Sequence, residues 1–302
     1  MNRTLRLAAL LLWCAAAPLR AQGLRLVMLG TGTPNPEPDR SGPALAVIAG
    51  GTAYLVDAGA GVVRRAQAAA EQRGIAALGA AHLRIVFLTH LHSDHTLGLP
   101  DLILTPWVLG RAIPLTVYGP PGTAAMVAHL EAAYAVDVRR RQDGWQPENA
   151  TGWRAIAHEI RPGPVYADSN VRVTAFHVLH GDWPDAFGYR FESGREVIVV
   201  SGDTRATDAV ADACDGCDIL VHEAYSDSGF ATLPADWQRY HRHFHTSAAD
   251  LARVATRAHP KLLVLTHTLT WGGVPRTTIV DELRRAGYTG RVVLANDLDV
   301  FP

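Results

Sequence analysis

Short apolar stretches separated by polar or glycine-rich turns run along most of the chain, a pattern typical of strands mixed with helices. The apolar stretches predict strands at residues 24–29, 83–88, 115–118, 171–178, 187–191, 197–200, 262–265 and 291–295, and a hairpin from 44–48 and 52–56. Helical periodicity predicts helices at 61–72, 123–134, 246–258 and 277–286. Residues 136–170 are polar and are predicted to form loops or weak strands. No linker or repeat interrupts the pattern, so residues 22–302 are predicted to form one α/β domain.

The first 21 residues have a different pattern. Arg3 and Arg6 precede an uncharged apolar stretch at residues 7–18, and a small residue, Ala21, follows. This arrangement is typical of a secretory signal peptide. It predicts a periplasmic or secreted protein with no membrane attachment after cleavage.

Charge and cysteine content restrict the classes of function. The 28 Lys and Arg residues against 29 Asp and Glu give a formal net charge of -1, so a broadly basic nucleic-acid-binding protein is not expected. Three cysteines exclude a disulfide-rich scaffold. Cys214 and Cys217 form a C-x-x-C pair that suits a small disulfide, with a redox or zinc pair as the alternative.

Histidines cluster directly after the predicted strand at 83–88, in the sequence H-L-H-S-D-H at residues 90–95. In extended backbone, residues 90, 92 and 94 point to one side, and a following turn would bring in His95. His180, Asp203 and His267 each follow another predicted strand, so all these side chains are expected to meet at one edge of a sheet. Imidazole and carboxylate groups are ligands for zinc and other first-row metals. A polar loop of hydrogen-bonded histidines is the alternative.

These motifs resemble the metallo-β-lactamase superfamily, and within it the branch of ribonuclease Z and zinc arylsulfatases. The resemblance rests on L-G-T-G-T-P at 29–34, R-x-G-P at 40–43, the histidine motif, G-Y-R at 188–190, S-G-D-T at 201–204, H-E-A at 222–224, H-T-S at 245–247 and the late T-H at 266–267. It implies a four-layer αββα sandwich and two zinc ions, with manganese or iron left open.

Carried over by position, the resemblance assigns seven metal ligands. One ion would take His90, His92 and His180, the other would take Asp94, His95 and His267, and Asp203 would bridge them. His177 competes with His180 for its place, but the spacing to the G-Y-R motif favours His180.

The remaining candidates concern catalysis and substrate. Two metal ions would activate a bridging hydroxide. Asp94 would also accept a proton, His245 would act as general acid or stabilise the leaving oxygen, and Glu223 would orient His245. Asp57 would support the metal loop, and His241 and His243 are interpreted as rim residues. The aromatic side chains of Trp183, Phe187 and Trp271 would line a substrate pocket.

The predicted function is an exported binuclear zinc hydrolase that cleaves sulfate or phosphate mono- and diesters, like an arylsulfatase or phosphodiesterase. A small anionic ester is the expected substrate and no nucleic acid is expected. The segment between Asp137 and Asn170 shows no glycine- and lysine-rich arm of the kind with which ribonuclease Z grips transfer RNA. The alternatives are hydrolysis of a lactone or β-lactam ring, and an inert zinc-binding scaffold. A homodimer is left open.

Overall fold

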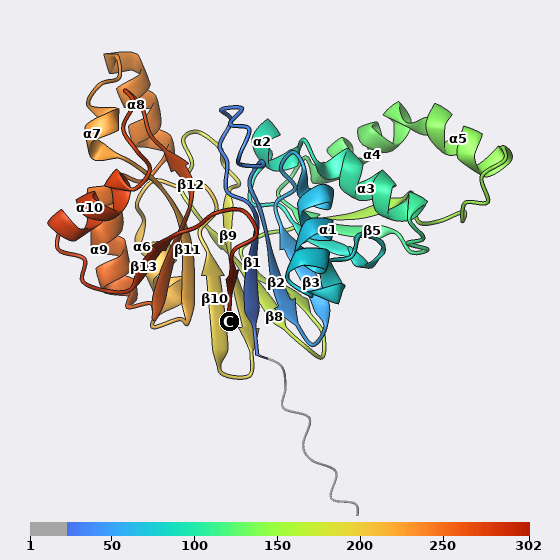
Figure 1. Cartoon of the computed structure of the whole chain (residues 1–302), viewed down its shortest axis with the longest axis horizontal. Coiled ribbons are helices and arrows are strands. Elements are labelled where there is room, and N and C mark those ends of the chain that lie inside the picture. The colour runs from blue at the N-terminus through green and yellow to red at the C-terminus, as the bar shows by residue number, and fades with distance from the viewer. Residues whose placement is uncertain (1–22) are drawn as a thin grey trace, which may run out of the picture.

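The computed structural model describes residues 23–302, so the predicted signal peptide lies outside the described residues. Two seven-stranded sheets pack face to face, and helices cover both outer faces (Figure 1). This is the four-layer αββα sandwich that the motifs imply.

Each sheet combines antiparallel hairpins with a parallel half. The first sheet has the order β14-β1-β2-β3-β4-β5-β6, and the second has the order β13-β12-β11-β10-β9-β8-β7. The strands of the first sheet are β1 (Arg25–Gly30), β2 (Ala44–Ala49), β3 (Thr52–Val56), β4 (Ile85–Phe87), β5 (Leu115–Gly119), β6 (Ala155–Glu159) and β14 (Val300–Phe301). Those of the second are β7 (Gly163–Ala167), β8 (Arg172–His177), β9 (Phe187–Ser193), β10 (Glu196–Val200), β11 (Ile219–Tyr225), β12 (Leu262–Leu269) and β13 (Val292–Leu294).

Alternating side chains divide the core into three layers. In β1, Leu26 and Met28 face the second sheet, whereas Val27 and Leu29 pack under the helices of the first sheet. Both sets are fully buried, which explains why the central strands read as unbroken apolar stretches.

The helices divide between the two outer faces. They are α1 (Val62–Gln72), α2 (Ser93–Thr96), α3 (Leu99–Val108), α4 (Thr123–Ala133), α5 (Ala135–Asp143), α6 (Asp208–Cys214), α7 (Asp227–Phe230), α8 (Ala235–Phe244), α9 (Ala248–Ala258) and α10 (Thr278–Arg285), with short 3-10 turns at Ala76–Leu78 and Ala80–His82. Helices α1 and α3 cover the first sheet, and α6, α9 and α10 cover the second. Among the described residues, no helix has the length and apolar character needed to cross a membrane.

Several elements differ from the sequence prediction. Residues 135–143, predicted as loop or weak strand, form α5, which continues α4 outward from the body of the molecule (Figure 1). Its sequence AVDVRRRQD buries only Val138, so the apolar periodicity that identifies a helix is missing. Helices α3, α6 and α8 and the strand β11 were not predicted either. Cys214 and Cys217 form a disulfide, one of the two interpretations of that pair.

Candidate metal centre

The candidate ligands lie where parallel strands of both sheets end. Strands β3, β4 and β5 run parallel in the first sheet, and β10, β11 and β12 run parallel in the second. Their carboxyl ends therefore open at the same edge of the sandwich, the position at which open α/β sheets bind ligands. His90 follows β4, Asp203 follows β10, and His267 lies in β12.

Local backbone geometry aims these side chains. Gly202 has φ 63°, and a Cβ there would lie 2.9 Å from the carbonyl oxygen of Phe187, so only glycine permits the turn that presents Asp203. His267 was predicted to follow its strand, but β12 continues to Leu269. The residue has φ 42° and sits in a β-bulge, where Thr266 pairs with Glu223 and Thr268 pairs with Ala224. The bulge turns the His267 side chain toward the centre.

The histidine motif also differs from an extended strand. Helix α2 begins at Ser93, directly after His92, so Asp94 and His95 occupy one helical turn. This turn, and not the alternation of an extended chain, brings both side chains into the centre.

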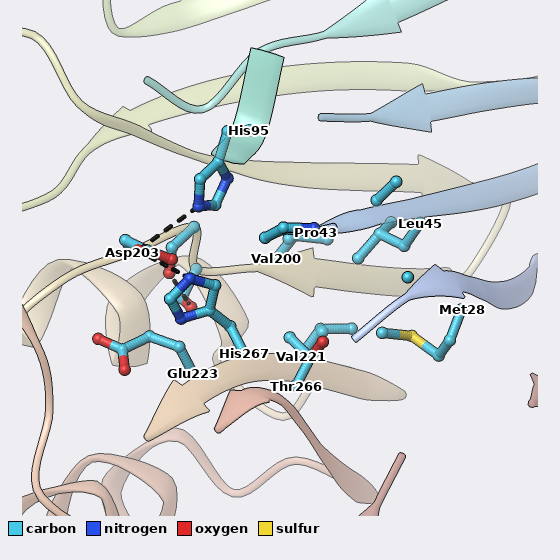
Figure 2. Close-up of a pocket in the computed structure, with 14 residues that line it drawn as sticks. Met28, Pro43, Leu45, His95, Val200, Asp203, Val221, Glu223, Thr266 and His267 are labelled. Atoms are coloured by element: carbon cyan, nitrogen blue, oxygen red, sulfur yellow. Dashed lines mark hydrogen bonds and ion pairs between the residues drawn. The ribbon is translucent and has the colours of Figure 1, made fainter. Parts of the chain in front are cut away.

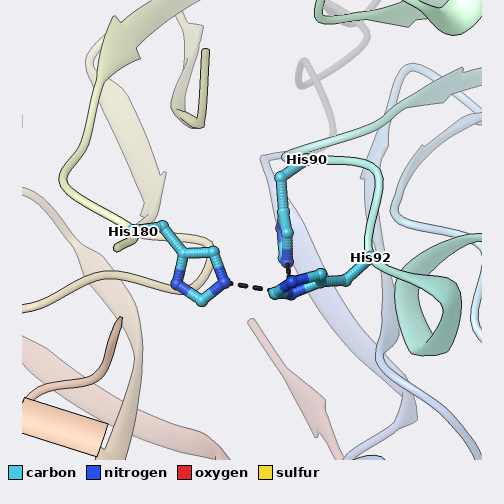
Figure 3. A group of neighbouring side chains, drawn as sticks. All are labelled: His90, His92 and His180. Carbon is cyan, nitrogen blue, oxygen red and sulfur yellow. Dashed lines mark hydrogen bonds between the residues drawn. The ribbon is translucent and has the colours of Figure 1, made fainter. Parts of the chain in front are cut away.

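Three histidines form the first group of the centre (Figure 3). Nδ1 of His92 lies 3.0 Å from Nε2 of His90 and 3.1 Å from Nε2 of His180. His90 and His180 are fully buried. The other nitrogens are held from outside: Nδ1 of His180 donates to the carbonyl oxygen of Phe244 at 2.9 Å, and the indole N–H of Trp183 donates to Nε2 of His92 at 2.9 Å.

Two histidines and two aspartates form the second group. Oδ2 of Asp203 lies 3.5 Å from Nε2 of both His95 and His267 (Figure 2). Oδ2 of Asp94 lies 3.2 Å from Nε2 of His267 and 3.5 Å from Nε2 of His95. Asp203 also lies in one cluster with His90 and in another with His180, so its carboxylate stands between the two groups.

The donor set fits divalent metal ions. Tetrahedral ligands at about 2.0–2.1 Å from zinc lie roughly 3.3 Å apart, and the separations of 3.0–3.5 Å here match that value. Nε2 of His95 is buried and makes no hydrogen bond within the described residues, although carboxylates surround it. A buried nitrogen of this kind is costly without a partner, and a cation supplies one.

Burial and charge tune the two groups differently. Burial lowers the pKa of His180 to about 3 and holds that of His90 well below its ordinary value, so both rings are neutral at pH 7 and present lone pairs. Burial also acts to lower the pKa of His95, but Asp203 and Asp57 outweigh it and raise that pKa well above normal. In Asp203, burial is outweighed by His267 and His95, which hold the carboxyl pKa well below its usual range.

A second layer of hydrogen bonds holds the ligands. Asp57 accepts from the backbone N–H of Thr89 at 2.8 Å, and its Oδ2 lies 2.7 Å from Nδ1 of His95. This agrees with the supporting role predicted for Asp57. Glu223 accepts from the backbone N–H of Thr246 at 3.0 Å, and its Oε1 lies 3.3 Å from Nδ1 of His245.

The structure thus brings all seven predicted ligands together, with Glu223 and His245 beside them; their role as ligands stays a prediction. His177 is exposed, and its Nε2 lies 3.1 Å from the carbonyl oxygen of Pro184, outside the centre. Phe187 is fully buried between the sheets and does not line an open pocket, in contrast to its predicted role.

Several contacts near the centre could not be predicted from the sequence. Trp183, predicted as a pocket wall, contacts a candidate ligand directly through its indole nitrogen. The carbonyl group of Phe244 orients His180, and a backbone acceptor cannot be recognised from residue type. His241, interpreted as a rim residue, is buried between Trp271 and His245, with ring centroids 4.4 and 5.6 Å away.

Comparison with known proteins agrees with this architecture. The family model for the beta-lactamase superfamily domain matches residues 52–268. Ribonuclease Z of Mycobacterium bovis is 34% identical over 278 residues, which cover 91% of this chain and 96% of that protein. Ribonuclease Z of Mycobacterium marinum is 34% identical over 283 residues, with 91% and 97% covered.

Solved structures share the fold. The metallo-beta-lactamase fold protein YhfI from Bacillus subtilis has a TM-score of 0.69 at 19% identity, and the match covers 92% of this chain and 99% of that one. The short form of human tRNase Z has a TM-score of 0.65 at 23% identity, with 92% and 98% covered.

These relatives correct two predictions. The predicted arylsulfatase- or phosphodiesterase-like activity is wrong, because the similar curated proteins are ribonucleases. The expectation of a small ester substrate and no nucleic acid is wrong for the same reason. Net charge averages over the whole chain and hides local basic segments, such as Arg139, Arg140 and Arg141 in α5. The signal peptide and the periplasmic or secreted location stay predictions.

Proposed function

We propose that this chain, which belongs to the ribonuclease Z-like branch of the β-lactamase superfamily, hydrolyses a phosphodiester bond in RNA. Its membership of that family makes it a metal-dependent hydrolase. RNA as the substrate is our proposal. The observation that carries it is the 34% identity to ribonuclease Z along 91% of the chain, together with an intact cluster of candidate ligands.

The residues of the centre have different proposed roles in the reaction. We assign two divalent ions to the two groups, with zinc as the first candidate; bound there, they would polarise the phosphate and lower the pKa of an attacking water molecule. Asp94 holds His267 and is the less buried of the two aspartates, which suits it to accept a proton from the attacking water. Asp203 supplies negative charge to both groups.

His245 is the candidate for a group that stabilises the leaving oxygen. Its Nδ1 faces Glu223 at 3.3 Å and Asp203 at 3.9 Å, so Nε2 is the nitrogen that makes neither contact. Burial lowers the pKa of His245 to about 4, so the ring is neutral at pH 7, and an N–H at Nε2 would stabilise the leaving oxygen by donating a hydrogen bond.

The outer part of the molecule also suits an RNA substrate. Helix α4 packs against β6, and α5 continues from it away from the sandwich on the side of the first sheet (Figure 1). Arg139 and Arg140 are exposed on α5, where they can contact phosphates beyond the scissile bond. The segment between Asp137 and Asn170 thus begins within an arginine-containing helix, and it still lacks a glycine- and lysine-rich arm.

A cleavage assay tests the proposal. Purified protein loaded with zinc or manganese is expected to shorten a transfer-RNA precursor that carries a 3′ extension, and His177→Ala is expected to cleave it equally well. Asp203→Asn is expected to abolish cleavage. An aryl sulfate and an aryl phosphodiester are assayed in parallel. Turnover of either small ester with no cleavage of RNA by the metal-loaded protein would refute the proposal.

A further inference from the structure

A row of aromatic side chains leads from the metal centre to the surface along α8. Trp237, Tyr240, His241 and Phe244 recur at the spacing of one helix face. We call Trp237, Tyr240 and His241 the α8 rim. The helix stands at the edge of the second sheet where β12 ends (Figure 1), and its last residue, Phe244, orients His180 through its carbonyl oxygen.

Ring contacts connect the α8 rim to the centre without interruption. Trp237 lies nearly parallel to His241, with centroids 5.8 Å apart, and His241 lies 5.6 Å from His245. His245 in turn lies 5.8 Å from His267 and nearly parallel to it. The ring contacts therefore run from the exposed Trp237 to the candidate ligand His267.

The exposure of Trp237 is unusual for a tryptophan that packs against other rings. Its side chain is 55% exposed, although Tyr240 and His241 support one side of it. The Trp237 ring packs against other rings on one side and is open to solvent on the other, so another flat ring can stack on its open side.

Positive charge accompanies the exposed ring. Arg239 and Arg242 lie on α8 beside the α8 rim and are exposed, and the guanidinium group of Arg242 lies 5.4 Å from the centre of the Phe230 ring. Aromatic side chains alternating with arginines in this way form the usual surface for single-stranded nucleic acid, where bases stack and phosphates pair with cations. Arg239 pairs with Asp236 within the helix, so Arg242 is the cation that a purely apolar partner would leave without a carboxylate among the described residues.

We propose that the α8 rim is a stacking subsite for a base of single-stranded RNA, a few nucleotides from the scissile bond. The proposal rests on the proposed function, because the RNA strand must continue from the metal centre. Trp237 is the residue that contacts the base, and Tyr240 and His241 support its ring. Arg239 and Arg242 contact the phosphates on either side.

Binding of a short RNA tests this subsite independently of cleavage. The dissociation constant of a fluorescent single-stranded hexanucleotide is measured by anisotropy in the presence of a chelator. Trp237→Ala is expected to weaken binding about 5- to 150-fold, the range for loss of one stacked base, and Trp237→Phe to restore most of it. Trp145→Ala removes another exposed tryptophan, on the loop after α5, and is expected to leave this constant unchanged.

A second arm of the experiment changes the RNA. Hexanucleotides that carry one abasic site are compared with the intact one, and at the stacked position the difference between wild type and Trp237→Ala should disappear. Equal binding by wild type and Trp237→Ala, with RNA cleavage intact, would overturn the subsite and leave the proposed function standing. A change of oligomeric state in Trp237→Ala without a change in RNA binding would assign the surface to a second copy of the chain. Absence of both RNA binding and cleavage in the wild type would overturn both proposals.

Discussion

Replacement of Asp203 by asparagine tests whether the negative charge of this side chain is needed for metal binding by both groups, or whether the side chain only fills space. The side chain is 4% exposed, and its Oδ2 lies 3.5 Å from a nitrogen of His95 and of His267. Asparagine keeps the shape and removes the charge. Loss of one partner of a buried charge pair costs about 3–5 kcal/mol, and about 1.4 kcal/mol is a factor of ten. Metal affinity is therefore expected to fall by roughly 150- to 4000-fold.

Competition with a chromogenic chelator measures this affinity, and elemental analysis of the dialysed protein measures stoichiometry. The wild type is expected to retain two ions, and Asp203→Asn to retain at most one. Far-UV circular dichroism establishes that the variant is folded. His177→Ala is the matched control, because His177 is exposed and bonded outside the centre.

Two results would refute the reasoning. Equal affinity and stoichiometry in wild type and Asp203→Asn would show that the carboxylate does not serve the metal ions. Equal metal loss in Asp203→Asn and His177→Ala would show that the geometry of the centre does not identify its ligands.

Three further expectations concern the surroundings of the centre. Asp57→Asn weakens the contact to Nδ1 of His95 and should reduce metal affinity about 10- to 100-fold with the fold intact; an unchanged affinity in the chelator competition would remove its supporting role. Chelation of the ions should lower the melting temperature by roughly 5–10 °C, because ligand at a hundred times its Kd contributes about 2.7 kcal/mol; identical scanning-calorimetry traces would contradict this. Burial lowers the pKa of His222 to about 4, so the stability that neutral His222 contributes is complete above about pH 6.5 and is lost as the pH falls toward 4. Urea titrations should show about 2 kcal/mol more loss between pH 7 and 5 in the wild type than in His222→Gln, and equal losses would show that the residue does not titrate.

Local patterns in the amino-acid sequence identify most strands and the candidate ligands, whereas the four-layer sandwich was implied by the resemblance to a known superfamily. Apolar stretches such as 44–48 and 197–200 mark buried strands whatever their neighbours are. The ligand motif at 90–95 is compact, and Asp203 and His267 are each recognisable next to a strand. The choice of His180 over His177 agrees with the geometry, since only His180 reaches His92.

Other features depend on contacts between residues far apart in the chain. The bulge that aims His267, the carbonyl of Phe244 on His180 and the indole of Trp183 on His92 arise from packing across 43 to 91 residues of sequence. Phe187 was predicted to contact substrate because it is an aromatic residue near the candidate ligands. Both faces of its strand are buried, so its side chain lies in the core instead. Helix α5 lacks an apolar face, because a projecting segment has little core to pack against. The pattern of apolar and polar residues indicates which side chains are buried. The position of α5 or of a stacking surface depends instead on what each helix or strand packs against in the folded protein.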